Sequence, residues 1–173
     1  QTSQSTLYAL LTNISKQNEV YKRAGGVHGC ALCQNDEQLI FVEDVGRHNA
    51  VDTISGLMWL NNISGEDKTF YTTGRLTSEM VIKVAQMSVP TLLSRSGITQ
   101  MGLSIAQQLG VTLIARAKGK HFLIFNGYAT PGLSFVGNKL FTHRNSTYGI
   151  PQAIAKCNYI HFRTFYKFLK NNG

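Results

Sequence analysis

The sequence predicts an α/β protein in which a mixed β-sheet carries helices on both faces. Short apolar segments of strand length alternate with longer segments whose apolar residues recur at helical spacing. Two of the strand-like segments are neighbours in the chain, which predicts a hairpin ahead of the alternating part. A hairpin followed by alternating helices and strands is typical of a mixed sheet covered on both sides.

The first elements are a helix and the hairpin. Apolar residues recur at helical spacing over Thr6–Ser15, and Ser5 is suited to the N-cap position. Val27–Leu32 and Leu39–Val42 predict two strands, joined by a turn at Gln34-Asn35-Asp36, because Asn and Asp favour tight reversals.

The elements that follow alternate between helix and strand. Helical spacing predicts helices at Asn49–Leu60, Ser78–Met87 and Thr99–Leu109, the last one ended by Gly110. Short apolar runs predict strands at Thr69–Thr72, Thr91–Leu93, Val111–Ala115 and Phe122–Phe125.

The composition of the sequence changes after Asn126. This change divides the chain into a core domain, residues 1–126, and a C-terminal extension, residues 127–173. Glycines and asparagines predict a loop over residues 127–149. Pro151 is suited to open a helix that runs to Leu169. We expect that helix to dock on the core, with a membrane surface or a partner protein as the alternatives.

Length and composition indicate one globular domain, because the 173 residues are 43% hydrophobic. No apolar run approaches the roughly 20 residues of a membrane span, and no signal-peptide pattern is present, so no membrane association is expected. Cys30, Cys33 and Cys157 form an odd set, which favours a reducing compartment, the cytoplasm. The first residue is Gln1 and not Met, which indicates a fragment or a processed product.

The net charge of +8 is distributed unevenly. All nine acidic residues precede residue 80, whereas eleven of the seventeen Lys and Arg residues follow it. Such a basic half attracts anions: phosphates, nucleotides, nucleic acid or an acidic protein. Charge alone does not choose among them, and a basic face that contacts only solvent stays an alternative.

Three turns that combine Gly with Arg are expected where a strand passes into a helix. At such places free N–H groups and the helix dipole hold anions, and Arg matches phosphate oxygens. Three turns together predict a polyanionic ligand, with ordinary loops paired to Glu43, Asp44 and Glu79 as the alternative. The turns are Val45-Gly46-Arg47-His48, Thr73-Gly74-Arg75-Leu76 and Ser94-Arg95-Ser96-Gly97.

Two further segments carry candidate site residues. Arg116-Ala117-Lys118-Gly119-Lys120-His121 alternates basic residues around a glycine, which is suited to a phosphate chain or to an exposed hairpin tip. His48 is the candidate for proton chemistry, because its ordinary pKa lies near neutrality, and it is equally suited to contact a ligand.

His28, Cys30 and Cys33 raise the question of a metal site, since this cysteine spacing matches half of a zinc site. On a strand, however, His28 and Cys30 would face one side and Cys33 the other. We therefore expect buried structural cysteines, with zinc or a reactive thiol as alternatives. Cys33, at the end of the expected strand, is the better placed for reactivity.

Five blocks together resemble the formate dehydrogenase accessory sulfurtransferases of the FdhD type, from about Leu7 to Phe125. They are AGGVHGCAL, EDVGRHNAVD, TTGRLTSEMV, LLSRSGITQMGLSIA and GVTLIARAKGKHF. The resemblance implies a sulfurtransferase that takes persulfide sulfur from a cysteine desulfurase. It passes the sulfur to the molybdenum or tungsten bis(molybdopterin guanine dinucleotide) cofactor of formate dehydrogenase. It also implies a cytidine-deaminase-like three-layer α/β/α sandwich.

The resemblance also implies a cofactor site, for which a guanine nucleotide would be a mimic. Its cofactor-binding stretch corresponds to the segment from Arg116 to His121, and the three Arg-bearing turns correspond to walls of the same pocket. These walls are Arg47-His48, Gly74-Arg75 and Ser94-Arg95-Ser96. The persulfide CxxC loop of the family is expected before Gln1, so no catalytic residue and no metal ligand is assigned here.

Alternatives remain for the function. A zinc deaminase would need a Glu and thiolates at the turns that here carry His48-Asn49-Ala50 and Ser94-Arg95-Ser96. A chaperone that holds the cofactor without sulfur chemistry is the second hypothesis. Nucleic acid is not an expected partner, because the basic segment lacks the interleaved aromatic residues of single-strand binders. A homodimer is a possible assembly.

Overall fold

The computed structural model describes residues 3–17, 19–127, 139–141 and 147–149. The helix expected between Pro151 and Leu169 lies outside the described residues. The loop expected over residues 127–149 contains two short strands, β7 (Lys139–Phe141) and β8 (Thr147–Gly149), which pair antiparallel. The division into two domains therefore stays a prediction.

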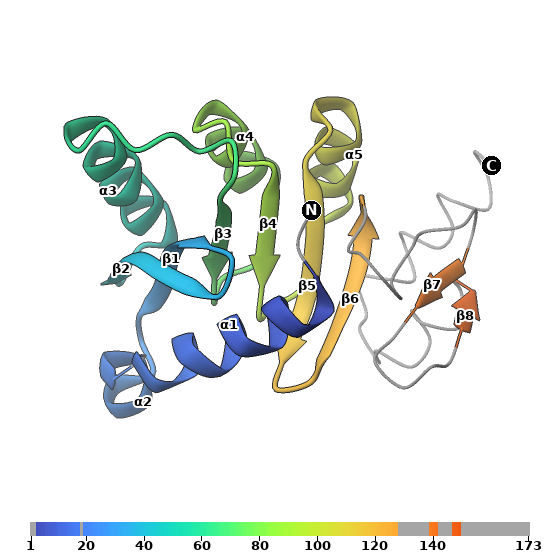
Figure 1. Ribbon diagram of the computed structural model, residues 1–173, viewed down its shortest axis with the longest axis horizontal. Coiled ribbons are helices and arrows are strands. Elements are labelled where there is room, and N and C mark those ends of the chain that lie inside the picture. Colours follow the sequence, from blue (N-terminus) through green and yellow to red (C-terminus); the bar gives the residue numbers. More distant parts are fainter. Residues whose placement is uncertain (1–2, 18, 128–138, 142–146, 150–173) are drawn as a thin grey trace.

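The main sheet has six strands in the order β2-β1-β3-β4-β5-β6. Strand β1 is antiparallel to β2 and to β3, β3 to β5 run parallel, and β6 returns antiparallel to β5. Four strands, β2 to β5, consequently point the same way and end at one edge, here called the carboxyl edge (arrowheads of β3, β4 and β5 in Figure 1). The strands are β1 (His28–Gln34), β2 (Glu37–Asp44), β3 (Thr69–Thr72), β4 (Thr91–Ser94), β5 (Thr112–Lys118) and β6 (His121–Asn126).

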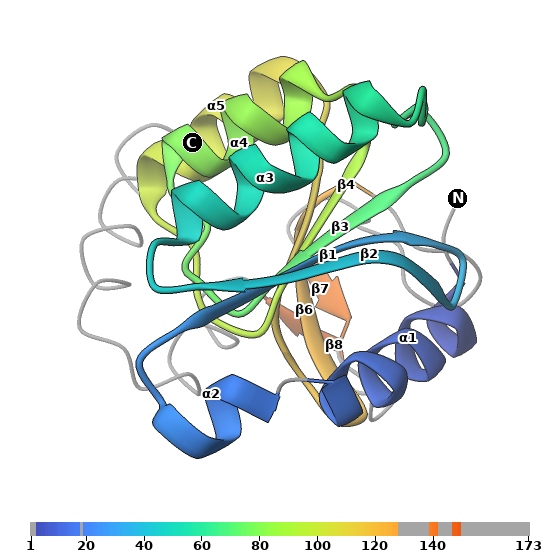
Figure 2. The ribbon, with the colours of Figure 1, turned by 90° about the vertical axis from the view of Figure 1, so that its left-hand side faces the viewer.

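Helices cover both faces of the sheet, as predicted (Figures 1 and 2). One face carries α3 (Arg47–Leu60), α4 (Ser78–Gln86) and α5 (Gln100–Leu109). The other face carries α1 (Gln4–Gln17), which is followed by the short α2 (Glu19–Ala24). The sequence did not predict α2, because none of its six residues is buried and no apolar stripe marks it. None of the helices in the described part of the chain is long and apolar enough to cross a membrane.

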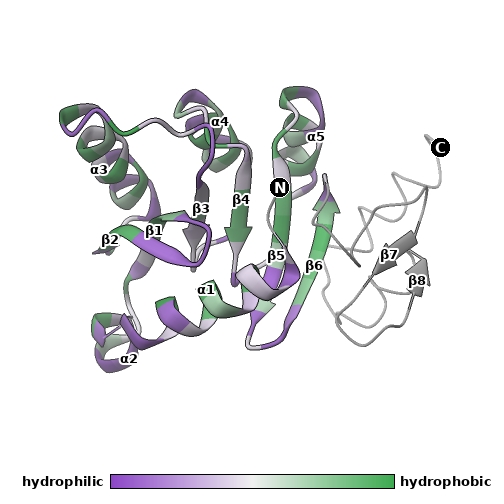
Figure 3. Cartoon of the chain, in the orientation of Figure 1, coloured by the Kyte–Doolittle hydropathy of each residue, from purple (hydrophilic) through white to green (hydrophobic). Residues whose placement is uncertain are grey.

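Two hydrophobic clusters fill the spaces between the layers. Neighbouring residues of the central strands point to opposite faces, as the pleat requires. Phe70 and Leu92 join the cluster under α3, α4 and α5, whereas Tyr71 and Leu93 join the cluster under α1. Burial on both faces explains why the middle of each strand, Phe70-Tyr71 in β3 and Leu92-Leu93 in β4, is aromatic or apolar. The arrowhead of β4 is accordingly green in Figure 3.

Local signals set several boundaries as expected. Thr99 caps α5, because its Oγ1 accepts a hydrogen bond from the N–H of Gly102 at 3.1 Å. Gly110 ends this helix in the left-handed conformation, with φ 71°. The hairpin turn also lies where it was predicted, with Asn35 at φ 54°.

Two helix glycines offer a matched test of the packing. A Cβ at Gly102 would lie 2.7 Å from the carbonyl oxygen of Leu76, whereas a Cβ at Gly56 meets nothing within 4 Å. We expect Gly102→Ala to lower the free energy of unfolding by about 1–3 kcal/mol through overpacking. Gly56→Ala should raise it by about 0.5–1 kcal/mol through helix propensity. Urea unfolding followed by circular dichroism measures both, and equal effects of the two variants would contradict this packing.

Candidate functional site

The three predicted Arg-bearing turns lie together at the carboxyl edge, where they connect β2 to α3, β3 to α4 and β4 to α5. Hydrogen bonds fix the second and third turns to each other. The N–H of Leu76 donates to the carbonyl of Gly97 at 2.9 Å, and that of Arg95 donates to Thr72 at 3.1 Å. The second and third turns are therefore fixed relative to each other.

Ser94 links the same two turns through its side chain. Its buried hydroxyl donates to the carbonyl oxygen of Gly74 at 2.6 Å and accepts from the N–H of Ser96 at 2.9 Å. The single hydroxyl proton is used within the protein. Ser94 thus shapes the site, whereas Ser96 is half-buried beside it.

Each of two glycines in these turns lies beside an arginine from a neighbouring element. A Cβ at Gly74 would lie 3.2 Å from Cδ of Arg47. A Cβ at Gly97 would lie 3.4 Å from Nη2 of Arg116 and 3.6 Å from its Nε and Cζ. Gly74 therefore lets Arg47 lie close against the backbone, whereas the distances at Gly97 are those of ordinary van der Waals contact.

A β-bulge brings Arg116 to the edge. The register of β5 shifts between Ala115 and Lys118, and Arg116 itself has φ 57°, in the left-handed region. Ala115 belongs to one core cluster and Ala117 to the other, so Arg116 is the extra residue between them. Its N–H donates to the carbonyl of Ser96 at 2.8 Å, which ties the bulge to the third turn.

The rest of that predicted segment is divided between the core and the solvent. Ala117 is buried under α1, so its side chain is closed to a ligand. Lys118, Gly119, Lys120 and His121 are exposed, and Gly119 and Lys120 form the tip of the β5–β6 hairpin. The structure thus brings Arg116 to the third turn and leaves the lysines on a protruding tip.

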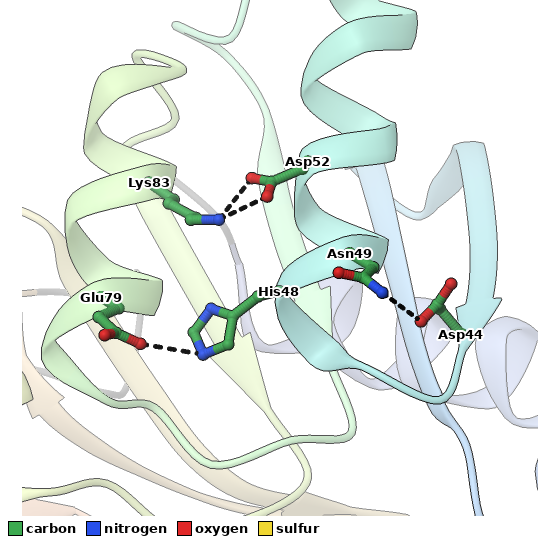
Figure 4. Close-up of polar contacts among 6 residues, drawn as sticks. All are labelled: Asp44, His48, Asn49, Asp52, Glu79 and Lys83. Atoms are coloured by element: carbon green, nitrogen blue, oxygen red, sulfur yellow. Dashed lines mark hydrogen bonds and ion pairs between the residues drawn. The ribbon is translucent and has the colours of Figure 1, made fainter.

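The charged residues that open α3 mostly have partners within the protein (Figure 4). Nε2 of His48 lies 3.0 Å from Oε2 of Glu79 on α4, a contact that becomes an ion pair when the imidazole is protonated. Asp52 pairs with Lys83 one helical turn further along the same two helices, at 2.6 Å. These contacts join α3 to α4, and Nε2 of His48 is engaged in one of them.

The two acidic residues at the end of β2 bind backbone N–H groups and not arginines. Asp44 accepts from the N–H of Gly46 at 2.7 Å and from the side-chain amide of Asn49 at 3.2 Å. Glu43 accepts from the N–H groups of Val20 and Tyr21 in α2, at 3.1 and 2.9 Å. The alternative in which these acids neutralise the arginines of the turns is therefore wrong for Glu43 and Asp44.

The arginines of the turns lack carboxylate partners. Within the described residues, Arg47, Arg75 and Arg95 form no ion pair. Nε of Arg47 is buried without a hydrogen-bond partner there, and so is Oγ1 of Thr77 at the start of α4. A buried N–H without an acceptor costs about 1–3 kcal/mol, and more when it is charged, so this edge is suited to an anionic ligand.

His28 also lies at this edge, although the sequence suggested it only as a metal ligand. Its Nδ1 would lie 3.4 Å from a Cβ at Gly74. Burial, followed by the charges of Arg47 and His48, lowers the pKa of His28, so a neutral imidazole faces the arginines at neutral pH. The antiparallel direction of β1 could have revealed this position, because the first residue of β1 lies at the edge where β2 and β3 end.

Cys30 and Cys33 lie on opposite faces of the sheet, as their spacing predicted. Both are fully buried, and burial raises the pKa of Cys30 to about 11 and that of Cys33 to about 12. The expectation of buried structural cysteines is confirmed, and the alternative of a reactive Cys33 is not supported, because β1 continues through Gln34 and Cys33 packs beneath α1. In the parts of the chain that the structure describes, no group of His, Cys, Asp or Glu side chains could hold a metal ion.

Comparisons with known proteins agree with the resemblance. The family described as FdhD/NarQ matches residues 1–130. A sulfur carrier protein FdhD from Bacillus pumilus (strain SAFR-032) is 32% identical over 123 residues, 71% of this chain and 47% of that protein. The FdhD sulfur carrier protein of Listeria monocytogenes serotype 4b (strain F2365) is 32% identical over 122 residues, 70% of this chain and 47% of that protein.

A solved structure shares the fold. It is the crystal structure of a candidate formate dehydrogenase accessory protein from Desulfotalea psychrophila, with a TM-score of 0.68 and 33% identity. The similarity covers 73% of this chain and 54% of that chain. This chain therefore spans about half the length of the curated relatives it matches.

The burial of the two cysteines leads to a test by alkylation. Because a raised pKa keeps each thiol protonated, iodoacetamide at about pH 8 should label Cys30 and Cys33 at least about 100-fold more slowly in the folded chain than in urea. Mass spectrometry of peptides measures each rate separately. Fast labelling of Cys33 in the folded protein would contradict its burial.

Proposed function

The chain belongs to the FdhD/NarQ family, and from this premise we propose that it binds the molybdenum or tungsten bis(molybdopterin guanine dinucleotide) cofactor at the carboxyl edge of its sheet. The cofactor is cargo here, held while sulfur is added to it and before it enters formate dehydrogenase. The names of the relatives support the sulfur step, and the name of the similar structure supports the link to formate dehydrogenase.

The observation that carries the proposal is the set of unpaired arginines on a rigid edge. Arg47 lies over Gly74 with a buried Nε that lacks an acceptor among the described residues. Arg95 lies in the adjoining turn, without a carboxylate partner in the described part of the protein. Guanidinium groups held in this way match the phosphate groups of a dinucleotide, which several anchors must grip.

The N-terminal ends of three helices add to the positive electrostatic potential at the carboxyl edge. The helices α3, α4 and α5 all begin at the carboxyl edge, so their positive dipole ends and first N–H groups meet there. We also propose that the core is cytidine-deaminase-like. The three-layer arrangement supports this proposal. In such a fold, the turns that carry His48 and Arg95 would correspond to the zinc-binding turns of a deaminase.

Sulfur transfer needs an accessible thiolate, and neither described cysteine is suited to it. Cys30 and Cys33 are buried with raised pKa values. We therefore propose that the sulfur from a cysteine desulfurase travels on another cysteine and reaches a cofactor held by this edge. The same burial favours, as a second candidate, a carrier that holds the cofactor without sulfur chemistry.

Nucleotide binding tests the cofactor site directly. We expect guanosine diphosphate to bind with an affinity that falls as salt rises, because phosphate contacts are screened by ions. Arg47→Ala should weaken binding about tenfold or more through a lost charge-assisted contact. Titration calorimetry at two salt concentrations measures this effect.

Lys16→Ala is the matched control, because it removes the same charge from the exposed end of α1. It should leave the affinity unchanged, while Arg47→Lys should recover part of it. Binding that is independent of salt, or equal losses in Arg47→Ala and Lys16→Ala, would contradict a specific site. Thermal unfolding of each variant shows whether the fold is intact.

The sulfur proposal has its own test. Incubation of the folded chain with a cysteine desulfurase and cysteine should add no sulfur to Cys30 or Cys33, because the desulfurase cannot reach them. Mass spectrometry of the intact chain and its peptides detects each added sulfur. A persulfide on Cys33 that disappears in Cys33→Ala would mean that this cysteine carries the sulfur after all.

A further inference from the structure

An aromatic side chain lies against one of the site arginines. Cζ of Arg95 lies 5.7 Å from the centre of the Tyr21 ring, within the range of a cation–π contact. Tyr21 belongs to α2, which precedes β1, whereas Arg95 lies in the turn between β4 and α5. Both residues are half-buried, so the contact is partly shielded from solvent.

Tyr21 is itself held in place from the end of β2. Helix α2 has no buried residue and thus no hydrophobic anchor of its own. The carboxylate of Glu43 accepts hydrogen bonds from the N–H groups of Val20 and Tyr21. Glu43 therefore orients Tyr21, and Tyr21 in turn lies against Arg95.

In the part of the chain that the structure describes, the guanidinium N–H groups of Arg95 form no ion pair. A guanidinium can lie against an aromatic ring, while its five N–H donors point outward in the plane of the guanidinium group. The backbone N–H of Arg95 is bound to Thr72, and its side chain forms no ion pair among the described residues. A held guanidinium loses less side-chain entropy when it binds a phosphate.

We propose that Tyr21 is a positioning residue of the ligand site, which holds the Arg95 guanidinium at the carboxyl edge so that its N–H groups meet a phosphate of the ligand. Glu43 supports this role by fixing α2. The inference rests on the proposed function, because it concerns the same site, and it names a residue outside the three turns and the Arg116–His121 segment.

A double-mutant cycle tests the coupling of the two residues, with guanosine diphosphate and inorganic pyrophosphate as probes. Tyr21→Ala should weaken the binding of both about two- to fivefold, as expected for the loss of one cation–π contact. In the background of Arg95→Ala, the same substitution should change neither affinity, because its only route to the ligand is gone. Calorimetry on the full chain measures all four proteins.

Conservative variants and a control complete the design. Tyr21→Phe keeps the ring and should bind as the unchanged protein does, whereas Tyr21→Leu keeps apolar bulk and should resemble Tyr21→Ala. Glu43→Ala should show a weaker loss in the same direction. Trp59→Ala removes an aromatic side chain that is 79% exposed near the end of α3, and it should have no effect.

Each outcome separates the role of Tyr21 from the proposed function. If the unchanged protein binds neither probe, the proposed function is wrong. If it binds both but the effects of Tyr21→Ala and Arg95→Ala add, the positioning role is wrong. Loss of affinity for guanosine diphosphate alone would mean that Tyr21 contacts the base, which also overturns the positioning role.

A measurement without ligand checks the contact itself. Phenylglyoxal modifies accessible guanidinium groups, so Arg95 should react faster in Tyr21→Ala than in the unchanged protein or in Tyr21→Phe. Peptide mass spectrometry gives the rate at this one residue, with Arg75 as the exposed internal reference. An unchanged rate at Arg95 in Tyr21→Ala would contradict the contact.

Discussion

The common direction of four strands is the constraint on which the rest of the structure depends. Because β2 to β5 all end at one edge, every strand-to-helix connection of this sheet reaches the same place, and three helices begin there. Residues that are far apart in the sequence, such as Arg47 and Arg116, are brought to neighbouring turns in this way. The hydroxyl of Ser94 and the Leu76–Gly97 hydrogen bond then hold the turns in one arrangement.

The acidic and the basic residues near the start of α3 have different roles. Acidic side chains are satisfied by backbone N–H groups or by partners on α4, so they stabilise turns and helix contacts. Arg47, which forms no ion pair among the described residues, lies against Gly74, where a side chain would crowd it. A carboxylate beside each arginine would have neutralised the positive charge of the edge. Removing the carboxylate from water would also have cost free energy, which the ion pair would have had to offset. Unpaired guanidinium groups keep the edge positive instead.

Most of the core could be predicted from sequence because periodicity records burial. Strand β3 was predicted with its observed bounds, since Thr69–Thr72 is buried on both faces and flanked by polar residues. Helix α2 could not be predicted, because it is attached to the protein by hydrogen bonds to Glu43, which lies 22 residues from Tyr21 in the sequence. The bulge at Arg116 and the partner of His48 depend likewise on tertiary contacts that no local pattern encodes.

Both cysteines are buried, as predicted, although the strand that carries Cys33 ends later than expected, and this burial bears on mechanism. In the sequence, Cys33 stands at the end of the expected strand and looks exposed. In the structure, α1 covers Cys33, which belongs to the hydrophobic core. A buried thiol with a raised pKa is a poor nucleophile, whereas an edge of unpaired arginines must stay open to an anion. The two requirements, shielding for the scaffold cysteines and access for the proposed cofactor, are met on different parts of one sheet. A sulfur donor that approaches the carboxyl edge from outside would therefore reach a bound cofactor without disturbing either hydrophobic cluster.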